Sequence, residues 1–366
     1  MNQIFPEIKK NFGFGCMRLP VKDNQVDYEE FSKMIDTFLE NGFNYFDTAV
    51  FYVDGKSEKA LGDCLAARHP RESFVLADKL SSISFKCKED IEPWVNTQLK
   101  TCGVEYFDFY LMHAQHAGNY DQYKDNGAYE EAFRLKKEGK LRHVGISFHD
   151  SAEFLEKILT DYPDIEFVQL QFNYVDYEDD RVQSRLCYEV CVKHGKPVFV
   201  MEPVKGGQLV NMPDPVGKIV DALGGGSRAS YAIRFAASFP NVAMVLSGMG
   251  NMAMMNDNIS MMKDFMPLDE KEMAALHKAA AIYRGEEMIP CTGCRYCVDD
   301  CPQQILIPDI FAAVNAGKNE GISADLQDIP GGKAGECVKC GKCEKNCPQF
   351  LPIRALLRKL AKQEGK

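Results

Sequence analysis

One repeated unit dominates the chain, a short apolar run followed by an amphipathic helical pattern. The apolar runs predict eight strands, over 12–19, 44–49, 74–80, 107–113, 143–149, 167–174, 197–203 and 242–249. The helical patterns cover 28–42, 57–68, 88–102, 128–139, 151–162, 180–194, 227–239 and 251–262. Strict alternation of eight near-equal units over about 250 residues is typical of a closed (β/α)8 TIM barrel. An open, doubly wound sheet is the alternative, but eight equal units favour closure.

Three successive predicted strands end on polar side chains. Asp47 ends the second strand, Lys79 the third and His113 the fourth, and Tyr52 lies five residues after Asp47. Barrel chemistry sits at the C-terminal ends of strands. A buried Asp–Lys pair beside a phenol favours phenolate, which lowers the pKa of the phenol, and an imidazole can orient a carbonyl. Each residue alone is an unremarkable strand end, but the four together indicate a proton-transfer site.

The later strand ends carry polar groups too and supply further candidate site residues. The eighth strand runs into a G-x-G-x-x-A pattern that opens a helix, where backbone N–H groups and the helix dipole can hold a phosphate. The glycine pattern alone is weak, and its position after the eighth strand strengthens it. No dinucleotide fingerprint follows an early strand, which argues against a Rossmann domain. The candidate residues are Ser147, Gln169, Met201, Glu202, Ser247, Gly248 and Asn251.

The C-terminal part carries eight of the fourteen cysteines, in two copies of C-x2-C-x2-C-x3-C-P at 291–302 and 337–348. Thiolates at these spacings hold three irons of a cubane, while the fourth cysteine reaches the other cluster. Zinc requires only C-x2-C pairs and explains neither the third cysteine nor the final Cys-Pro. The other six cysteines are scattered, and we interpret them as buried thiols: Cys16, Cys64, Cys87, Cys102, Cys187 and Cys191.

Residues 10–262 resemble the aldo-keto reductases. The resemblance rests on the four strand-end residues above and on the stretches 13–20 (GFGCMRLP), 111–113 (LMH) and 145–147 (GIS). In that family a nicotinamide dinucleotide lies across the C-terminal mouth of the barrel. The resemblance implies that Tyr52 is the general acid, that Lys79 lowers its pKa, that Asp47 holds Lys79, and that His113 orients the carbonyl.

The same resemblance implies nucleotide contacts. Ser147 and Gln169 match positions that hold the carboxamide, and Asp257 and Asn258 match positions that contact adenine. The chain departs from the family at four positions. Phe148 stands where an amide is usual, and Met201 stands where an aromatic ring is usual. Gly248 and Met254 stand where cationic side chains are usual. We therefore expect NAD or NADP to bind, without a strong preference for NADP. A flavin has no motif here, although a barrel mouth can bind one without a motif.

The cysteine-rich part resembles bacterial two-cluster ferredoxins. The resemblance implies two 4Fe-4S clusters, one held by Cys291, Cys294, Cys297 and Cys347 and the other by Cys337, Cys340, Cys343 and Cys301. The insert between the motifs is long, with a helical pattern over 307–315 and many glycines over 318–336. We therefore expect a small, mainly helical domain. The predicted division is a barrel over 1–266, a linker helix over 267–287 and the ferredoxin-like domain over 288–366.

Composition limits the choice of partners and location. The net charge of -10 argues against nucleic-acid binding, and no apolar run reaches the roughly 20 residues of a membrane span. The start of the sequence lacks the pattern of a signal peptide. We expect a cytoplasmic enzyme that acts on a small carbonyl or alcohol, with a ferredoxin or flavodoxin as electron partner. The alternatives are purely structural clusters, or an electron-transfer or docking protein with an inactive barrel.

The run 269–284 predicts where the clusters lie. It has high helix propensity and is long enough to return the chain from the bottom of the barrel to its mouth. We expect the ferredoxin-like module at or beside the rim of the barrel, near the nucleotide site. In the alternative, the helix crosses the bottom of the barrel and the module lies far from Tyr52.

Overall fold

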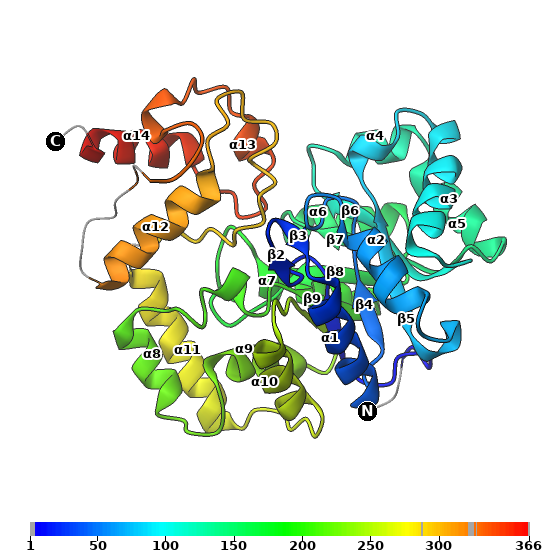
Figure 1. Ribbon diagram of the computed structural model, residues 1–366, viewed down its shortest axis with the longest axis horizontal. Coiled ribbons are helices and arrows are strands. Elements are labelled where there is room, and N and C mark those ends of the chain that lie inside the picture. Colours follow the sequence, from blue (N-terminus) through cyan, green and yellow to red (C-terminus); the bar gives the residue numbers. More distant parts are fainter. Residues whose placement is uncertain (1–3, 287, 321–325, 327, 365–366) are drawn as a thin grey trace.

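The computed structural model describes residues 4–286, 288–320, 326 and 328–364, and its largest element is a closed barrel of eight parallel strands (Figure 1). Around the barrel the order is β1-β10-β9-β8-β7-β6-β5-β4. The predicted (β/α)8 barrel is thus confirmed, and the open sheet is wrong. The strands are β1 (Phe12–Gly15), β4 (Tyr45–Asp47), β5 (Val75–Leu80), β6 (Phe107–Gln115), β7 (Leu141–Phe148), β8 (Phe167–Gln171), β9 (Val198–Met201) and β10 (Val242–Ser247).

Helices surround the barrel where the periodicity predicts them. They are α1 (Tyr28–Glu40), α2 (Ser57–Leu61) with a π-helical turn after it (Gly62–Ala66), α3 (Ile91–Cys102), α5 (Ala128–Lys137), α6 (Ala152–Asp161), α7 (Ser184–Lys193), α9 (Arg228–Ala237) and α10 (Met252–Met262). Sequence reasoning missed several short elements of the barrel part, among them the hairpin β2 (Val21–Lys22) and β3 (Gln25–Val26), α4 (Tyr120–Asp125) and α8 (Asp214–Asp221).

Aromatic side chains fill the inside of the barrel below the site. Phe5 enters from the N-terminal segment, with its ring centroid 5.0 Å from that of Phe109. Phe167 fits because its neighbour on β7 is Gly145, where a Cβ atom would lie 2.5 Å from the Phe167 ring. The barrel floor is therefore packed solid, and the mouth is the end left for chemistry.

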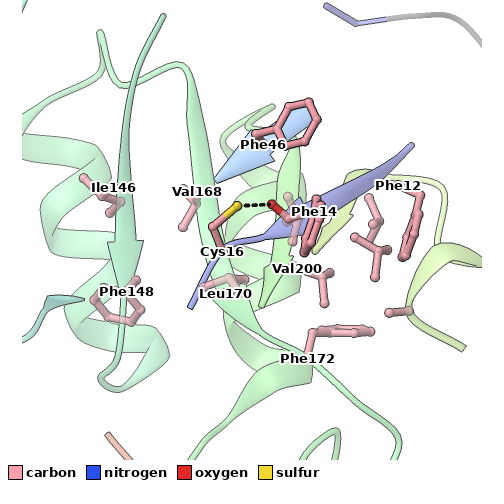
Figure 2. Close-up of a cluster of buried hydrophobic side chains, with 14 of the residues drawn as sticks. Phe12, Phe14, Cys16, Phe46, Ile146, Phe148, Val168, Leu170, Phe172 and Val200 are labelled. Carbon is pink, nitrogen blue, oxygen red and sulfur yellow. Dashed lines mark hydrogen bonds between the residues drawn. The ribbon is translucent and has the colours of Figure 1, made fainter. Parts of the chain in front are cut away.

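A second apolar layer joins the strands to the surrounding helices. Figure 2 shows part of it, where Phe12, Phe14 and Phe46 lie among aliphatic side chains and the Cys16 thiol donates to the Phe14 carbonyl at 3.5 Å. Five of the six scattered cysteines are buried, as predicted, but Cys87 is exposed. That prediction was wrong because Cys87 begins a short surface turn at Lys88–Asp90.

The rest of the chain forms a long helix and a small helical module. The predicted linker helix is α11 (Glu270–Gly285), which begins with a capping box between Asp269 and Glu272. The module contains α12 (Ile307–Glu320), α13 (Lys342–Lys345) and α14 (Ile353–Glu364) around its own apolar core. The helix expected over 307–315 is confirmed, and the glycine-rich stretch 318–336 lies partly outside the described residues. The domain boundaries themselves stay a prediction. None of the described helices is both long and apolar enough to cross a membrane.

The module sits on the mouth of the barrel (Figure 1). Arg18, which follows β1, donates to the Thr292 carbonyl at 2.8 Å, and Gln208 donates to the Cys291 carbonyl at 2.7 Å. The side-chain nitrogen of Gln349 donates to the side-chain oxygen of Gln171, at the end of β8, at 2.6 Å. The predicted placement at the rim is confirmed, and the alternative below the barrel is wrong.

Candidate active site

A buried ion pair forms the base of the site. Lys79 on β5 donates to Asp47 at the end of β4 at 2.7 Å and to the Thr48 carbonyl at 2.7 Å. The side chains of Lys79 and Asp47 are 1% and 4% exposed. The Lys79 ammonium lies 4.9 Å from the centroid of the Tyr52 ring. The ends of neighbouring strands and the loop after β4 thus bring the Asp47–Lys79 ion pair and the Tyr52 phenol together.

His113 on β6 completes the predicted group. The Ser81 hydroxyl lies 2.7 Å from His113 Nδ1, and the ring centroids of Tyr52 and His113 are 6.3 Å apart. Burial, with the Lys79 charge adding to it, lowers the pKa of His113 well below its usual value. The imidazole is therefore neutral near pH 7. A Ser81 hydroxyl that donates to Nδ1 leaves the ring proton on Nε2, which faces the mouth.

The expected lowering of the Tyr52 pKa is wrong for this structure. Burial raises the pKa of the phenol well above its usual value, and the carboxylates of Asp47 and Glu202 raise it further. Arg18 opposes this shift. Lys79, whose ammonium is paired with Asp47 at 2.7 Å, does not reverse this rise. Tyr52 consequently keeps its proton at neutral pH, as a general acid must.

Sequence reasoning missed a second phenol in the site, Tyr296. It lies between Cys294 and Cys297, and its hydroxyl is 3.4 Å from His113 Nε2. The ring centroids of Tyr296 and Phe51 are 6.4 Å apart. The first cysteine motif therefore forms a wall of the candidate site. Only the placement of the module at the rim could have suggested this contact.

The candidate nucleotide residues lie at the mouth, several already engaged within the protein. Ser147 accepts from the Ala114 N–H at 2.7 Å, while the one side-chain hydrogen bond of Gln169 within the described residues is a long one, 3.4 Å, to Asp47. Met201 is partly buried at the end of β9. Gln169 is thus a buried amide with unused hydrogen-bonding capacity beside the catalytic pair, as a carboxamide ligand requires.

The residues after β10 are brought together around the start of α10. Asn251 caps this helix by accepting from the Met254 N–H at 2.9 Å. Two side-chain hydrogen bonds hold the other candidates: Asn258 donates to Ser247 at 3.2 Å, and Ser227 donates to Asp257 at 2.6 Å. The Glu30 carboxylate accepts from the Met252 N–H at 3.1 Å. An anion therefore already lies where the sequence predicts a phosphate.

Glu202 and Arg18 form a charged pair beside Tyr52. Their charged groups are 3.8 Å apart, and burial raises the pKa of Glu202. Arg18 also packs against the exposed Gly248, within 3.5 Å of where a Cβ atom would stand. Sequence reasoning did not single out Arg18, because the residue lies more than 200 positions before Gly248 in the chain.

The structure brings the cysteines together in the two predicted sets. In the first set, Cys291, Cys294 and Cys297 lie near Cys347. Burial is the main cause that raises the pKa values of these three thiols, and the nearby Cys347 raises them further. The second set lines one cavity of about 330 Å³, counting its open mouth, and comprises Cys301, Cys337, Cys340 and Cys343. Each set therefore combines three cysteines of one motif with the last of the other.

The two motifs also share a backbone conformation. The third and fifth residues of each have positive φ, at 69° and 67° for Gly293 and Arg295 and at 60° and 81° for Lys339 and Gly341. Such turns direct backbone N–H groups into a concavity that suits anionic iron–sulfur centres. In the described part of the chain, no three His, Cys, Asp or Glu side chains converge closely enough for a single metal ion.

Family profiles match both parts of the chain. The profile described as the aldo/keto reductase family matches residues 11–281. The chain belongs to the aldo/keto reductase family. A second profile, described as a 4Fe-4S dicluster domain, matches residues 290–351. The barrel and the cysteine module therefore each correspond to a known family.

Curated relatives of this aldo/keto reductase are distant. An aldo-keto reductase of Gibberella moniliformis is 30% identical over 40% of this chain and 45% of its own length. An uncharacterized oxidoreductase of Bacillus subtilis is 27% identical over 55% of this chain and 63% of its own length. The NADH-specific methylglyoxal reductase of Escherichia coli is 27% identical, covering 54% and 62%. The chain thus spans only about half to two thirds of the length of these relatives.

Solved structures share the barrel. An aldo-keto reductase from Bacillus halodurans, in its holo form, aligns with a TM-score of 0.61 at 24% identity, covering 74% of this chain and 91% of that one. An aldo-keto reductase from Klebsiella pneumoniae in complex with NADPH aligns with a TM-score of 0.61 at 19% identity, covering 76% and 92%. At these identities the likeness shows the fold alone.

Proposed function

We propose that this protein reduces a small-molecule carbonyl, or oxidises the corresponding alcohol, with a nicotinamide cofactor, and that two 4Fe-4S clusters exchange electrons with a partner. The observation that carries the proposal is the buried group of Asp47, Lys79, Tyr52 and His113 at the mouth of an aldo/keto reductase barrel. The cysteine module lies directly over this group, with Tyr296 in contact with His113.

Each residue of the group has a distinct task in the proposed reaction. When bound, the nicotinamide supplies or accepts the hydride, and the clusters supply or accept single electrons. Tyr52 gives its phenolic proton to the carbonyl oxygen during reduction and takes it back in the reverse direction. The neutral His113 holds the carbonyl oxygen through Nε2–H, and the Asp47–Lys79 pair fixes the phenol without a net charge beside it.

The nucleotide contacts are also proposals. Gln169 and Ser147 would hold the carboxamide, and Met201 would lie against the nicotinamide ring. Glu202 suits ribose hydroxyls better than phosphates, because a carboxylate only accepts hydrogen bonds. The start of α10 is already capped by Glu30 and would not take a phosphate. The residues after β10 would instead hold the adenosine end: Ser247, Gly248, Asn251, Asp257 and Asn258.

We predict that protein purified without oxygen contains about eight irons per chain, because two cubanes need them. The cysteine sets would each hold one cluster, through Cys291, Cys294, Cys297 and Cys347 or through Cys301, Cys337, Cys340 and Cys343. Iron and zinc are counted by elemental analysis, and the visible spectrum is recorded. Stoichiometric zinc with little iron would contradict the assignment.

We predict that NADPH binds with no large advantage over NADH. Three cations from other loops and helices could in principle bind a 2′-phosphate, but each is already paired with a carboxylate. The ion-pair distances are 2.5 Å for Lys205, 2.7 Å for Arg228 and 3.1 Å for Arg234. Arg18 reaches Gly248, but it donates to Thr292 and faces Glu202. Dissociation constants for both nucleotides decide the matter. A preference for NADPH of about 100-fold, nearly 3 kcal/mol, would refute the prediction.

The same titration tests whether the two halves of the protein are coupled. Each nucleotide is added without oxygen to the purified protein while the cluster absorption is followed. Bleaching of that absorption means that electrons pass from the nucleotide to the clusters. If both nucleotides bind, reduce a carbonyl and leave the absorption unchanged, the clusters are structural, and that part of the proposal fails.

A further inference from the structure

The second cysteine set faces away from the catalytic site. The first set adjoins the barrel, because Cys291 and Thr292 accept hydrogen bonds from Gln208 and Arg18. The second set lines a cavity that opens at the surface, where Cys340 is exposed and Val338 is 57% exposed. One end of the module thus meets the site and the other meets solvent.

The segment 333–362, which supplies most of the cavity lining, is strongly basic, although the chain as a whole is acidic. Residues 333–362 contain eight Lys or Arg and only two Glu, whereas the net charge of the chain is -10. The lining of the cavity includes Lys339 and Arg354 but no carboxylate. The two carboxylates are engaged locally, since Glu344 pairs with Arg354 at 2.6 Å and Glu336 accepts from the Lys333 N–H at 2.8 Å.

Further exposed cations lie on the two helices in and after the second motif. Lys342 lies in the first turn of α13, and Lys345 ends that helix. Arg358 lies one turn after Arg354 on α14, so both side chains project from the same side of that helix. Lys359 is exposed beside Arg358. We call the exposed set Lys339, Lys342, Lys345, Arg354, Arg358 and Lys359 the basic rim.

We propose that the basic rim is the docking surface for a small acidic one-electron carrier protein, which exchanges electrons at the second cysteine set. The inference rests on the proposed function, because it assumes that these cysteines hold a cluster. During reduction, one electron leaves the carrier and is taken up by the cluster bound to Cys301, Cys337, Cys340 and Cys343. The carrier is oxidised by one electron, and no covalent bond forms or breaks.

Several physical features favour such a carrier over other partners. Opposite charges steer encounter and raise association rates most for brief, small interfaces, the kind that electron carriers form. The exposed Val338 supplies an apolar contact beside Lys339 at the cavity. Two residues of the rim, Lys339 and Arg354, line the cavity together with the cysteines, so a partner that binds the rim would lie close to the second set. A carrier seated on Cys340 would approach the cluster with little protein between them.

The test uses a purified acidic [2Fe-2S] ferredoxin, reduced beforehand, as the probe. It is mixed without oxygen with the iron-loaded protein in a stopped-flow instrument, and its reoxidation is followed at its own absorption band. The variant is Lys339→Glu with Lys342→Glu. We expect the second-order rate constant at low salt to fall at least tenfold, within the 10–10³-fold range of electrostatic steering. The difference from the parent protein should shrink as salt screens the charges.

A matched control separates the rim from total charge. Lys100→Glu with Lys137→Glu makes the same change in net charge on α3 and α5, far from the module (Figure 1). This control should react at nearly the parent rate. Arg358→Glu with Lys359→Glu provides a second rim variant whose residues do not adjoin a cysteine, in case the first one loses iron. Equal rates for rim, control and parent proteins would overturn the proposal.

The readout keeps this proposal apart from the proposed function. Electron entry into the clusters requires no carbonyl, no nucleotide and no Tyr52. Slow ferredoxin oxidation by a parent protein that has eight irons and normal carbonyl reduction would refute the docking surface alone. In a second outcome against the proposal, duplex DNA binds the parent protein but not the rim variant, and ferredoxin transfers no electrons to either. That result would assign the rim to a nucleic acid instead.

Discussion

Replacing Tyr52 by phenylalanine is expected to lower the rate of carbonyl reduction by about 10²- to 10⁴-fold, the usual loss when a general acid is removed. The change deletes one hydroxyl and leaves the ring, which lies beside the Lys79 ammonium, in place. Nucleotide binding and iron content should stay as in the parent protein. The measurements are single-turnover rates, nucleotide dissociation constants and iron analysis.

The matched control is Tyr45→Phe on β4, the strand that precedes the Tyr52 loop. The Tyr45 hydroxyl is buried and has no hydrogen-bond partner among the described residues, and the ring belongs to the packed interior of the barrel. Its loss should leave the rate unchanged, because the group is remote from the mouth. If Tyr52→Phe reduces carbonyls as fast as Tyr45→Phe, the assigned mechanism is wrong.

The barrel and most of the catalytic group could be predicted because both are written in local patterns. Each strand–helix unit shows its own period, and parallel strands bring Asp47, Lys79 and His113 to one end whatever the details of packing. The cysteine spacings are equally local. They imply that the last cysteine of each motif belongs to the set formed by the other motif. The cavity that Cys301 shares with Cys337, Cys340 and Cys343 agrees with that assignment.

Features that depend on contacts between distant segments could not be predicted. The sign of the Tyr52 pKa shift depends on burial and on Glu202, and neither is visible from the Asp–Lys–Tyr pattern. Tyr296 meets His113 across 183 positions of sequence. Arg18 reaches Thr292 across 274. Such contacts exist only because the linker helix returns the module to the mouth, and the sequence predicts that path only as one of two alternatives.

A second buried ion pair lies in the barrel where the module contacts it. Lys205 donates to Asp176 at 2.5 Å, and the two side chains are 2% and 1% exposed. The other carboxylate oxygen of Asp176 accepts from Gln171 and Asn173 at 2.7 and 2.6 Å. Gln349, two residues after Cys347, completes the network through Gln171 and a 3.4 Å contact with Lys205. The fourth cysteine of the first set is thereby held against the barrel.

Lys205→Met is expected to lower the free energy of unfolding by about 3–5 kcal/mol, because it leaves the Asp176 carboxylate buried without a counter-charge. Urea denaturation of the iron-loaded protein measures the change. Fluorescence of Trp94, the sole tryptophan, reports on the barrel, and the cluster absorption reports on the module. Because Gln349 contacts the same lysine, the module should also separate from the barrel, with the cluster absorption lost at lower urea than the Trp94 signal.

Two further variants test the origin of this loss. Asp176→Asn combined with Lys205→Met removes both charges and should recover much of the stability, because a neutral amide is far cheaper to bury than a lone carboxylate. Lys218→Met breaks a Lys–Asp pair of similar length, 3.1 Å, whose side chains are 76% and 82% exposed. That change should cost no more than about 0.5 kcal/mol. A Lys205→Met protein as stable as Lys218→Met would mean that water reaches Asp176, and that the module is held to the mouth by its other contacts instead.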